Sequence, residues 1–337
     1  MFSTGSQRKY WMFKTEDELM NLRYEANLRF IESREDLDES FKDVPYEYFL
    51  SPSQERSLIC YYEKRLRKLC LKFQPPMPRS VVGTAFQFYK RFYLNNSVMD
   101  HHPKHILVTC VYLACKVEEF NVSMAQFLAN IKGDRAKAAD IVLNNELLLM
   151  QELKYHLTVH NPFRPIEGFL IDLKTRAAKG IDPEKFRPHI DTFIDKVFFT
   201  DACLLYSPSQ IALASVVYAA SMIKCGSNIE DYLTNLFADD PKKLETVQTI
   251  MRSILNMIKS NQRIEGVSKD QVIAIERKLE NCRNQSNNPD SREYKRALQS
   301  QDNEDEPLAK YAKLSQEMQR DNDAYLNPTT SSARNSG

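Results

Sequence analysis

Glycine is scarce in this chain, with 8 among 337 residues, well under the roughly 7% of an average protein. Few stretches alternate apolar and polar residues as half-buried strands do. Neither a glycine-rich phosphate loop nor an HExxH or GxSxG motif occurs. These absences predict an all-α protein that lacks a catalytic constellation and is not an enzyme.

The cysteines form no pattern of metal ligands or disulfides. There are seven, an odd number, and no CxxC pair occurs. The nearest two, Cys110 and Cys115, lie inside an apolar segment, as reduced core thiols of an intracellular protein do. His101, His102 and His105 have helical spacing, but too few Cys or carboxylates lie nearby to complete a metal site. We expect a solvated loop and first helical turn there, with no metal and no cofactor.

A charge excess of one sign and a long hydrophobic run are also missing. Lys and Arg number 46 against 45 Asp and Glu, which argues against a protein that binds nucleic acid through its phosphates. A local basic patch is compatible with a net charge near zero. We interpret the basic run at residues 64–68 as a solvated helix face rather than as such a patch. No apolar run approaches the roughly 20 residues of a membrane span, and the N-terminus lacks the apolar core of a secretory signal. We therefore predict neither direct nucleic-acid binding nor a membrane partner.

Residues 77–122 are the most informative part of the sequence about the fold. A helix with an aromatic stripe is followed by a second helix, beginning at Pro103, that is apolar almost all round. The stripe consists of Phe86, Phe88, Tyr89, Phe92 and Tyr93. A helix that is apolar on every side must be enclosed by other helices. The second helix is thus expected at the centre of a compact helical domain, with its charged end, Lys116 to Glu119, at one edge.

Capping residues and prolines delimit the other helices. A Thr15-x-x-Glu18 capping box opens an N-terminal helix, and Ser51-Pro52-Ser53-Gln54 opens one that ends at Phe73. Later expected elements are a short helix from Ser123 to Ile131, a long one from about Ala136 to Leu157, and one opened by Ser268-x-x-Gln271.

The pattern of helices repeats after a rigid boundary at residues 160–165. With an offset of 105 residues, Pro103 aligns with Pro208 and Ile106 with Ile211. The other aligned pairs are Leu58 with Phe163, Leu66 with Ile171, Phe88 with Phe193, Ala114 with Ala219, and Leu153 with Ile258. Because these positions match in character, we interpret them as two copies of one five-helix unit. The polar residues from 285 to 337 are expected to form a disordered tail, with a transient helix near residues 308–318.

The segments FYKRFYLNNSV and CVYLACKVEEF resemble the second and third helices of the cyclin box. Three further segments agree in order: CYYEKRLRKLC, ELLLMQELKYHLTVHNPFRPIEGFLIDLKTR and LLYSPSQIALASVVYAAS. The resemblance to the cyclin family covers roughly Gln7 to Cys282. It implies an all-α fold of two tandem five-helix cyclin boxes with extra N- and C-terminal helices. The expected divisions are 1–50 (N-terminal helix and linker), 51–160 (first box), 161–262 (second box), 263–284 (C-terminal helix) and 285–337 (tail).

Lys116 and Glu146 are the sharpest candidates for a binding site, since each is a charge on an otherwise buried helix. From the residues alone, the two either pair with each other or present charge to a partner. In cyclins, a Lys and a Glu at these positions bind backbone groups of the kinase, so the resemblance carries a kinase-binding role to Lys116 and Glu146. Glu119, Phe120 and Leu149 are the further kinase-binding candidates.

The resemblance implies a regulatory subunit that activates a cyclin-dependent kinase. The segments are most similar to those of the cyclin of the cyclin-dependent-kinase-activating kinase. The implied partners are that kinase, a RING-finger assembly factor and the core of transcription factor TFIIH. The implied substrates are activation loops of other cyclin-dependent kinases and the C-terminal repeats of RNA polymerase II, which places the protein in the nucleus.

Three readings remain open at this stage. The chain is either this cyclin or another transcription-type cyclin that serves a different kinase. A cyclin-fold transcription factor that binds promoter DNA is a third reading, although its zinc-ribbon cysteines are missing. Residues 56–62 lack the MRAIL-like pattern of cell-cycle cyclins, so we expect no recruitment of Arg-x-Leu substrate motifs.

Overall fold

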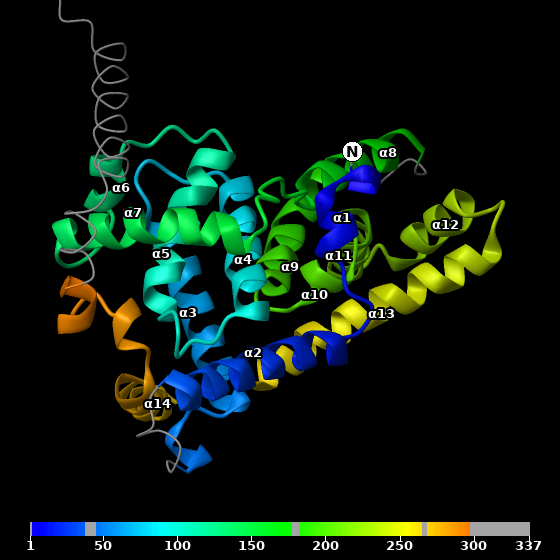
Figure 1. Ribbon diagram of the computed structural model, residues 1–337. Coiled ribbons are helices and arrows are strands. Elements are labelled where there is room, and N and C mark those ends of the chain that lie inside the picture. Colours follow the sequence, from blue (N-terminus) through cyan, green and yellow to red (C-terminus); the bar gives the residue numbers. More distant parts are fainter. Residues whose placement is uncertain (1, 38–44, 177–181, 265–267, 297–337) are drawn as a thin grey trace, which may run out of the picture.

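The chain folds into two bundles of helices that lie side by side (Figure 1). The computed structural model describes residues 2–37, 45–176, 182–264 and 268–296, and these contain helices but no strand. The first bundle contains α3 (Pro52–Lys72), α4 (Arg79–Asn95), α5 (Pro103–Val117), α6 (Met124–Ala129) and α7 (Arg135–Glu152). The second contains α8 (Phe163–Arg176), α9 (Arg187–Phe198), α11 (Pro208–Met222), α12 (Gly226–Leu236) and α13 (Pro241–Ile264), with the short α10 (Ala202–Leu205) between α9 and α11. The predicted all-α fold of two five-helix units is confirmed, whereas the exact division points stay predictions.

The two apolar helices α5 and α11 are the centres of their bundles. Helix α5 contacts α3, α4 and α7, and α11 contacts α8, α9, α12 and α13. Each begins with a proline, Pro103 or Pro208, in its first turn. The offset of 105 residues therefore superimposes the starts of the two central helices, as the aligned prolines predicted.

One aligned pair fails in the structure. Leu66 is fully buried, but Ile171 has 64% of its surface exposed. The buried residues of α8 are Ile166, Leu170 and Leu173. Successive helical residues are about 100° apart, so burying Leu170 turns Ile171 toward solvent.

The capping boxes predicted at Ser51 and Ser268 are present, and Ser123, predicted to cap a short helix, forms a third. In each, the serine side chain accepts a bond from the third helical N–H while the Gln side chain accepts from the serine N–H. At α2 (Glu16–Leu37), the Thr15 hydroxyl accepts from the Glu18 N–H at 3.2 Å. The Glu18 carboxylate accepts from the Lys14 N–H instead of closing the box on Thr15. Local capping chemistry thus sets where most of these helices begin.

Helix α7 ends at Glu152, five residues before the predicted end at Leu157. Lys154 and Tyr155 both have left-handed backbones, with φ of 53° and 55°. An L-residue in that region cannot continue a right-handed helix. The chain therefore turns sharply here and leads into the connection to α8.

The bundles are joined closely at the start of α4. A Cβ on Gly83 would lie 2.2 Å from Oδ1 of Asn161 in the connection to α8. The Asn161 amide donates to the Ser80 carbonyl at 3.2 Å and to the Thr84 hydroxyl at 3.1 Å. Only glycine fits this approach, and next to it the Phe86 ring stacks on Phe198 of α9 at 5.4 Å between ring centroids.

A buried charge cluster also ties the bundles together. Asp201, which precedes α10, accepts two bonds of 2.9 Å from Arg23 of α2 and one of 3.0 Å from Arg56 of α3. Lys90 of α4 lies 3.7 Å from Asp201 and 2.6 Å from Glu63 of α3. Burial alone would raise the pKa of Asp201, but the three cations hold it well below its usual range. We call these five residues the buried charge cluster.

The terminal helices pack on the first bundle. Helix α2 contacts α3 and α4, and α14 (Lys269–Cys282) contacts α3. The predicted apolar stripe of α2 is buried at Leu19, Ala26 and Phe30. The short α1 (Ser6–Tyr10) precedes α2 and lies in front of the second bundle in Figure 1.

The predicted disordered tail is wrong for its first residues. The Asn284 N–H donates to the Met99 carbonyl at 2.8 Å, and the Asn287 side chain donates to Asp100 at 2.8 Å. Further along, the Asn144 amide of α7 donates to the Tyr294 hydroxyl at 2.7 Å. These polar residues are held by backbone and side-chain hydrogen bonds rather than by apolar burial, which is why their composition suggested disorder. Residues 297–337, including the proposed transient helix, lie outside the described residues.

Candidate functional site

Lys116 and Glu146 meet at one edge of the first bundle. Lys116 lies in the last turn of α5 and Glu146 in the middle of α7, which packs against α5. The Lys116 Nζ donates to both carboxylate oxygens of Glu146, at 2.8 and 2.9 Å. It also lies 4.8 Å from the centroid of the Tyr112 ring. The two charges thus pair with each other in the isolated chain.

This pair remains accessible from outside. The Lys116 side chain is 50% exposed and that of Glu146 is 14% exposed. An ion pair at such a surface contributes little to stability, about 0–1 kcal/mol. Its weakness leaves both groups able to exchange their mutual bonds for bonds to another protein.

A tight turn at the end of α5 shapes one side of the site. Glu119 has a left-handed backbone with φ of 55°, and its N–H bonds the Lys116 carbonyl at 3.2 Å. The Phe120 N–H reaches the Cys115 carbonyl at 2.9 Å. This is the hydrogen bonding of a Schellman turn. It leaves the Glu119 side chain exposed and packs Phe120 against the Phe73 ring at 6.4 Å.

Leu149 does not belong to the accessible site, which corrects that prediction. Its side chain has no exposed surface, and it lies in the core with Val142 and Leu153. Residues 142, 149 and 153 share the face of α7 that is turned to the core. The role of Leu149 is therefore to hold α7 in place.

The prediction missed apolar residues on the outer face of α7. Leu143 and Leu147 each have 50% of their surface exposed, one turn apart and on either side of Glu146. Met150 follows on the same face and is half-buried. Tyr155, just beyond the helix, is 60% exposed. The signal was present in the sequence, because α7 carries large apolar residues on more faces than one bundle can bury.

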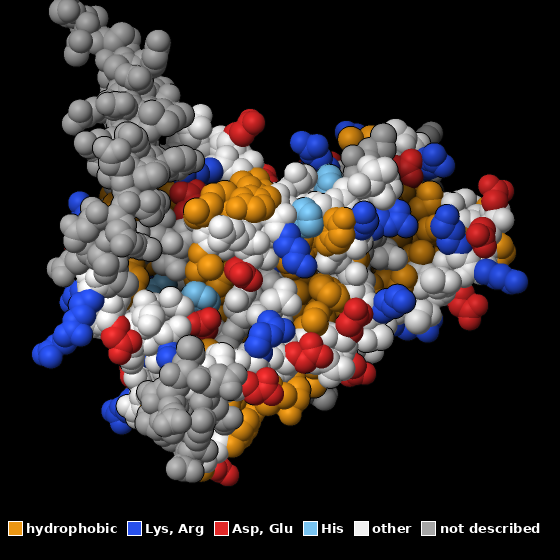
Figure 2. Space-filling model, viewed as in Figure 1, with side chains coloured by type: hydrophobic (Ala, Val, Ile, Leu, Met, Phe, Trp, Pro, Cys, Tyr) orange, Lys and Arg blue, Asp and Glu red, His pale blue; other side chains and the backbone are white. Residues whose placement is uncertain are grey.

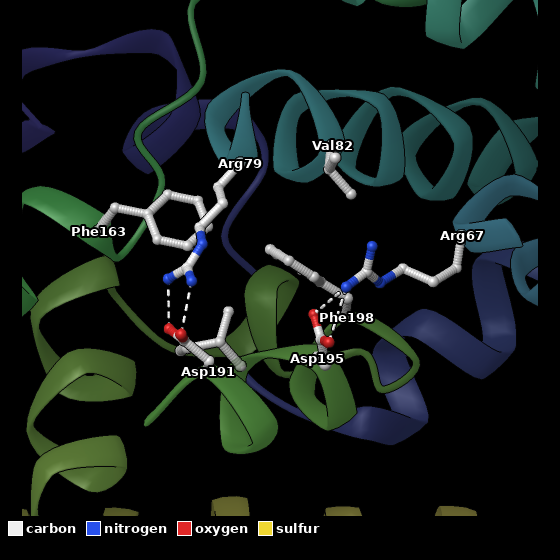
Figure 3. Close-up of a pocket in the computed structure, with 8 residues that line it drawn as sticks. Arg67, Arg79, Val82, Phe163, Asp191, Asp195 and Phe198 are labelled. Atoms are coloured by element: carbon white, nitrogen blue, oxygen red, sulfur yellow. Dashed lines mark hydrogen bonds and ion pairs between the residues drawn. The ribbon is translucent and has the colours of Figure 1, made fainter. Parts of the chain in front are cut away.

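The hollow between the two bundles was also not foreseen (Figure 3). It measures about 80 Å³ and is bordered by two ion pairs, Arg67 with Asp195 and Arg79 with Asp191. The apolar part of its lining comes from Val82, Phe163, Ile194 and Phe198. Because both guanidinium groups already face carboxylates of the other bundle, these residues stabilise the packing of the bundles. The basic run at residues 64–68 is accordingly not one uniform solvated face.

The histidines near Pro103 lie at the N-terminal end of helix α5. The His102 Nδ1 accepts from the Lys104 N–H at 3.1 Å and thereby caps α5. Burial lowers the pKa of His102 to about 2 and that of His105 to about 3, and neighbouring cations add to both effects. Both rings are therefore neutral. Within the described ranges, no group of three or more His, Cys, Asp or Glu residues is placed to hold a metal ion, and no helix is both long and apolar enough to span a bilayer.

Comparisons with known proteins match both bundles. The family described as "Cyclin, N-terminal domain" matches residues 33–158, and "Cyclin C-terminal domain" matches residues 161–259. Cyclin-H of Xenopus laevis is 43% identical over 288 residues, which cover 84% of this chain and 87% of that protein.

Solved structures are similar as well. A chain of the yeast TFIIK complex is 29% identical with a TM-score of 0.58, covering 76% of this chain and 99% of that chain. A chain of the CAK complex of Chaetomium thermophilum bound to ATP-γ-S is 22% identical with a TM-score of 0.72, covering 100% and 98%. At that identity, the second similarity supports the fold alone.

Proposed function

The chain belongs to the cyclin family, and on that premise we propose that it binds a cyclin-dependent kinase and activates it without contributing a catalytic atom. The observation that carries the proposal is the accessible Lys116–Glu146 pair at the edge of a preformed helical bundle. The resemblance to cyclins assigns Lys116 and Glu146 to the positions that bind backbone groups of the kinase, which supports the proposal.

The docking surface that we propose combines charge with apolar area. Glu146 lies between Leu143 and Leu147, each of which is half exposed. Glu119 and Phe120 border the surface at the end of α5. Burying the exposed part of a leucine contributes on the order of 1 kcal/mol, since full burial contributes about 1.5–3 kcal/mol. The leucines would supply affinity, while Lys116 and Glu146 would fix the register through directed bonds.

Activation would follow from selecting one conformation of the kinase. A cyclin-dependent kinase alone holds its mobile helix outward, so the helix Glu cannot pair with the strand Lys that binds ATP phosphates. A rigid surface that fits only the inward position shifts the population toward it and moves the activation loop. Such a mechanism needs rigidity in the cyclin, which the buried residues behind α5 and α7 supply.

We propose a more specific assignment from the relatives. The similarity to Cyclin-H and to a chain of TFIIK supports a subunit of the cyclin-dependent-kinase-activating kinase. Its further partners would be a RING-finger assembly factor and the TFIIH core. The substrates would be activation loops of other kinases and the C-terminal repeats of RNA polymerase II, with the protein in the nucleus.

Exchanging the two charges tests whether Lys116 and Glu146 bind a kinase or only pair with each other. Lys116→Glu combined with Glu146→Lys restores an internal pair of opposite polarity. The fold should lose at most about 1 kcal/mol, because a Glu at the end of α5 opposes the helix dipole. Kinase binding should weaken at least about 30-fold, since breaking a desolvated charged contact costs about 2–5 kcal/mol.

The matched control is the exposed pair of Arg187 and Glu167 in the second bundle. Exchanging these two charges should leave kinase binding unchanged. Titration calorimetry with a panel of cyclin-dependent kinases measures both effects. Kinase binding that survives the exchange at Lys116 and Glu146 would refute the site.

A further inference from the structure

A basic and aromatic face lies where α1 meets the connection between α7 and α8. It consists of Lys9, Tyr10, Lys154, Tyr155 and His156. The Tyr10 ring stacks on His156 at 4.6 Å between centroids, and the Lys9 Nζ lies 4.9 Å from the Tyr10 centroid. Tyr10 is 47% and Tyr155 60% exposed. Figure 2 shows Lys, Arg and His side chains gathered over and around α1.

This face lacks the carboxylates that would balance its charge. Among the described residues, neither Lys9 nor Lys154 forms an ion pair with an Asp or Glu. Burial and then Arg91, Lys154 and Lys9 lower the pKa of His156, so the described charged groups that act most on this ring are cations. The Trp11 Nε1–H donates to the His156 Nδ1 at 3.2 Å, which fixes the neutral ring in one orientation. The face therefore combines unbalanced positive charge with the exposed rings of Tyr10 and Tyr155.

An acidic segment lies nearby in the same chain. The last described residues run along α7, where the Tyr294 hydroxyl bonds Asn144. Beyond them, residues 302–306 read Asp-Asn-Glu-Asp-Glu and are followed by Pro307 and Leu308. This run holds four carboxylates in five residues, and the two residues after it are apolar.

The chain is long enough to bring this run to the face. Asn144 and Lys154 are ten residues apart, roughly 15 Å along a helix. The six residues from Arg296 to Asp302 span up to about 20 Å when extended. A tethered segment of this length acts at an effective concentration on the order of millimolar, so weak contacts suffice.

We propose that residues 302–306 bind the basic and aromatic face formed by α1 and the α7–α8 connection. The carboxylates lie near Lys9 and Lys154, and Pro307 and Leu308 pack on the exposed rings of Tyr10 and Tyr155. The proposal does not depend on the kinase-binding role of Lys116 and Glu146. An acidic segment of another protein is the alternative occupant, which the test below separates.

The pKa of His156 in the full chain reports whether residues 302–306 occupy the face. It is measured by NMR from the ring C–H signal of His156. The test variant neutralises the run with Asp302→Asn, Glu304→Gln, Asp305→Asn and Glu306→Gln. One carboxylate 8 Å away in a water-like medium raises the pKa of a histidine by about 0.4. The variant should therefore lower the pKa of His156 by at least about 0.4 at low salt. The difference should disappear near 0.5 M salt, where charges are screened within a few ångströms.

The matched control removes four charges elsewhere, with Glu35→Gln, Asp36→Asn, Asp38→Asn and Glu39→Gln. It should leave the pKa of His156 unchanged. An equal change in both variants would mean a general effect of net charge and would overturn the proposal. If the tail variant left the pKa of His156 unchanged, an acidic segment of another protein would remain as the occupant of the face. That result would overturn the proposal equally.

A second measurement reads the other side of the contact. In the full chain, Lys9→Ala with Lys154→Ala should shift the backbone amide signals of residues 302–306. The control, Lys242→Ala with Lys243→Ala at the exposed start of α13, should not. Unchanged signals in the first variant would contradict binding at this face.

Discussion

Glu55 offers a sharp test of the packing around the first bundle. It lies in the first turn of α3 with 5% of its surface exposed. Its carboxylate accepts from the Ser97 hydroxyl and from the Val98 N–H at 3.2 Å. Burial raises the pKa of Glu55 to about 7, and the hydrogen bonds from Ser97, Asn27 and the Val98 backbone only partly offset that effect.

The sign and the size of the effect follow from this pKa. In the unfolded chain the carboxyl titrates near 4.5, so the folded protein holds the proton more tightly. The resulting stability is fully present below about pH 4.5 and is lost as the pH rises through about 7. It amounts to about 3 kcal/mol, of which about 2.5 kcal/mol is lost between pH 5 and pH 8.

Glu55→Gln should remove this dependence, because the amide stays neutral and its oxygen still accepts from Ser97 and Val98. Relative to the unchanged protein, the variant should gain about 2.5 kcal/mol in free energy of unfolding between pH 5 and pH 8. Urea denaturation at both pH values measures this, and Glu25→Gln on the exposed side of α2 is the control. A difference between Glu55→Gln and the unchanged protein that is the same at both pH values would refute the reasoning.

Three further substitutions test the packing by chemical denaturation. Asp201→Asn leaves the cations of the buried charge cluster with Glu63 alone and should cost about 3–5 kcal/mol; a loss below about 1 kcal/mol would contradict the cluster. Gly83→Ala should lower the free energy of unfolding by about 1–3 kcal/mol through overpacking. Gly168→Ala, in an open helical position, should raise it by about 0.5–1 kcal/mol. Equal effects would show that the close approach at α4 is unimportant. Leu149→Ala should cost about 2–5 kcal/mol and its exposed neighbour Leu147→Ala at most about 0.5 kcal/mol, and the reverse order would mean that the faces of α7 are misassigned.

Local chemistry in the sequence predicted where helices begin. Serine with Gln three residues later, and proline in the first turn, act through bonds within four residues and need no knowledge of the fold. The apolar character of α5 likewise predicted its central place, since only enclosure by other helices can bury all its faces. These signals were sufficient for the all-α class, whereas the repeat was inferred from the 105-residue alignment together with the resemblance to cyclins.

Contacts between distant segments could not be predicted in this way. Arg23 and Asp201 are 178 positions apart, and nothing near either residue in sequence indicates the partner. Leu149 and Leu147 are neighbours of the same type, so only the orientation of α7 separates a core residue from an exposed one. For Lys116 and Glu146, the sequence left internal pairing and partner binding open, and the structure shows that the isolated chain adopts the first.

The central claim is that a rigid surface at Lys116 and Glu146 holds a kinase in its active conformation. The most direct measurement is the rate at which a purified cyclin-dependent kinase phosphorylates a peptide substrate, alone and with this chain at saturating concentration. We expect the unchanged chain to raise that rate strongly for one kinase. When the unchanged chain and the variant with exchanged charges at Lys116 and Glu146 are then compared at one equal, subsaturating concentration, the variant should raise the rate far less. If every candidate kinase stayed as inactive with the chain as without it, or if the exchanged variant activated equally well, the account would be contradicted.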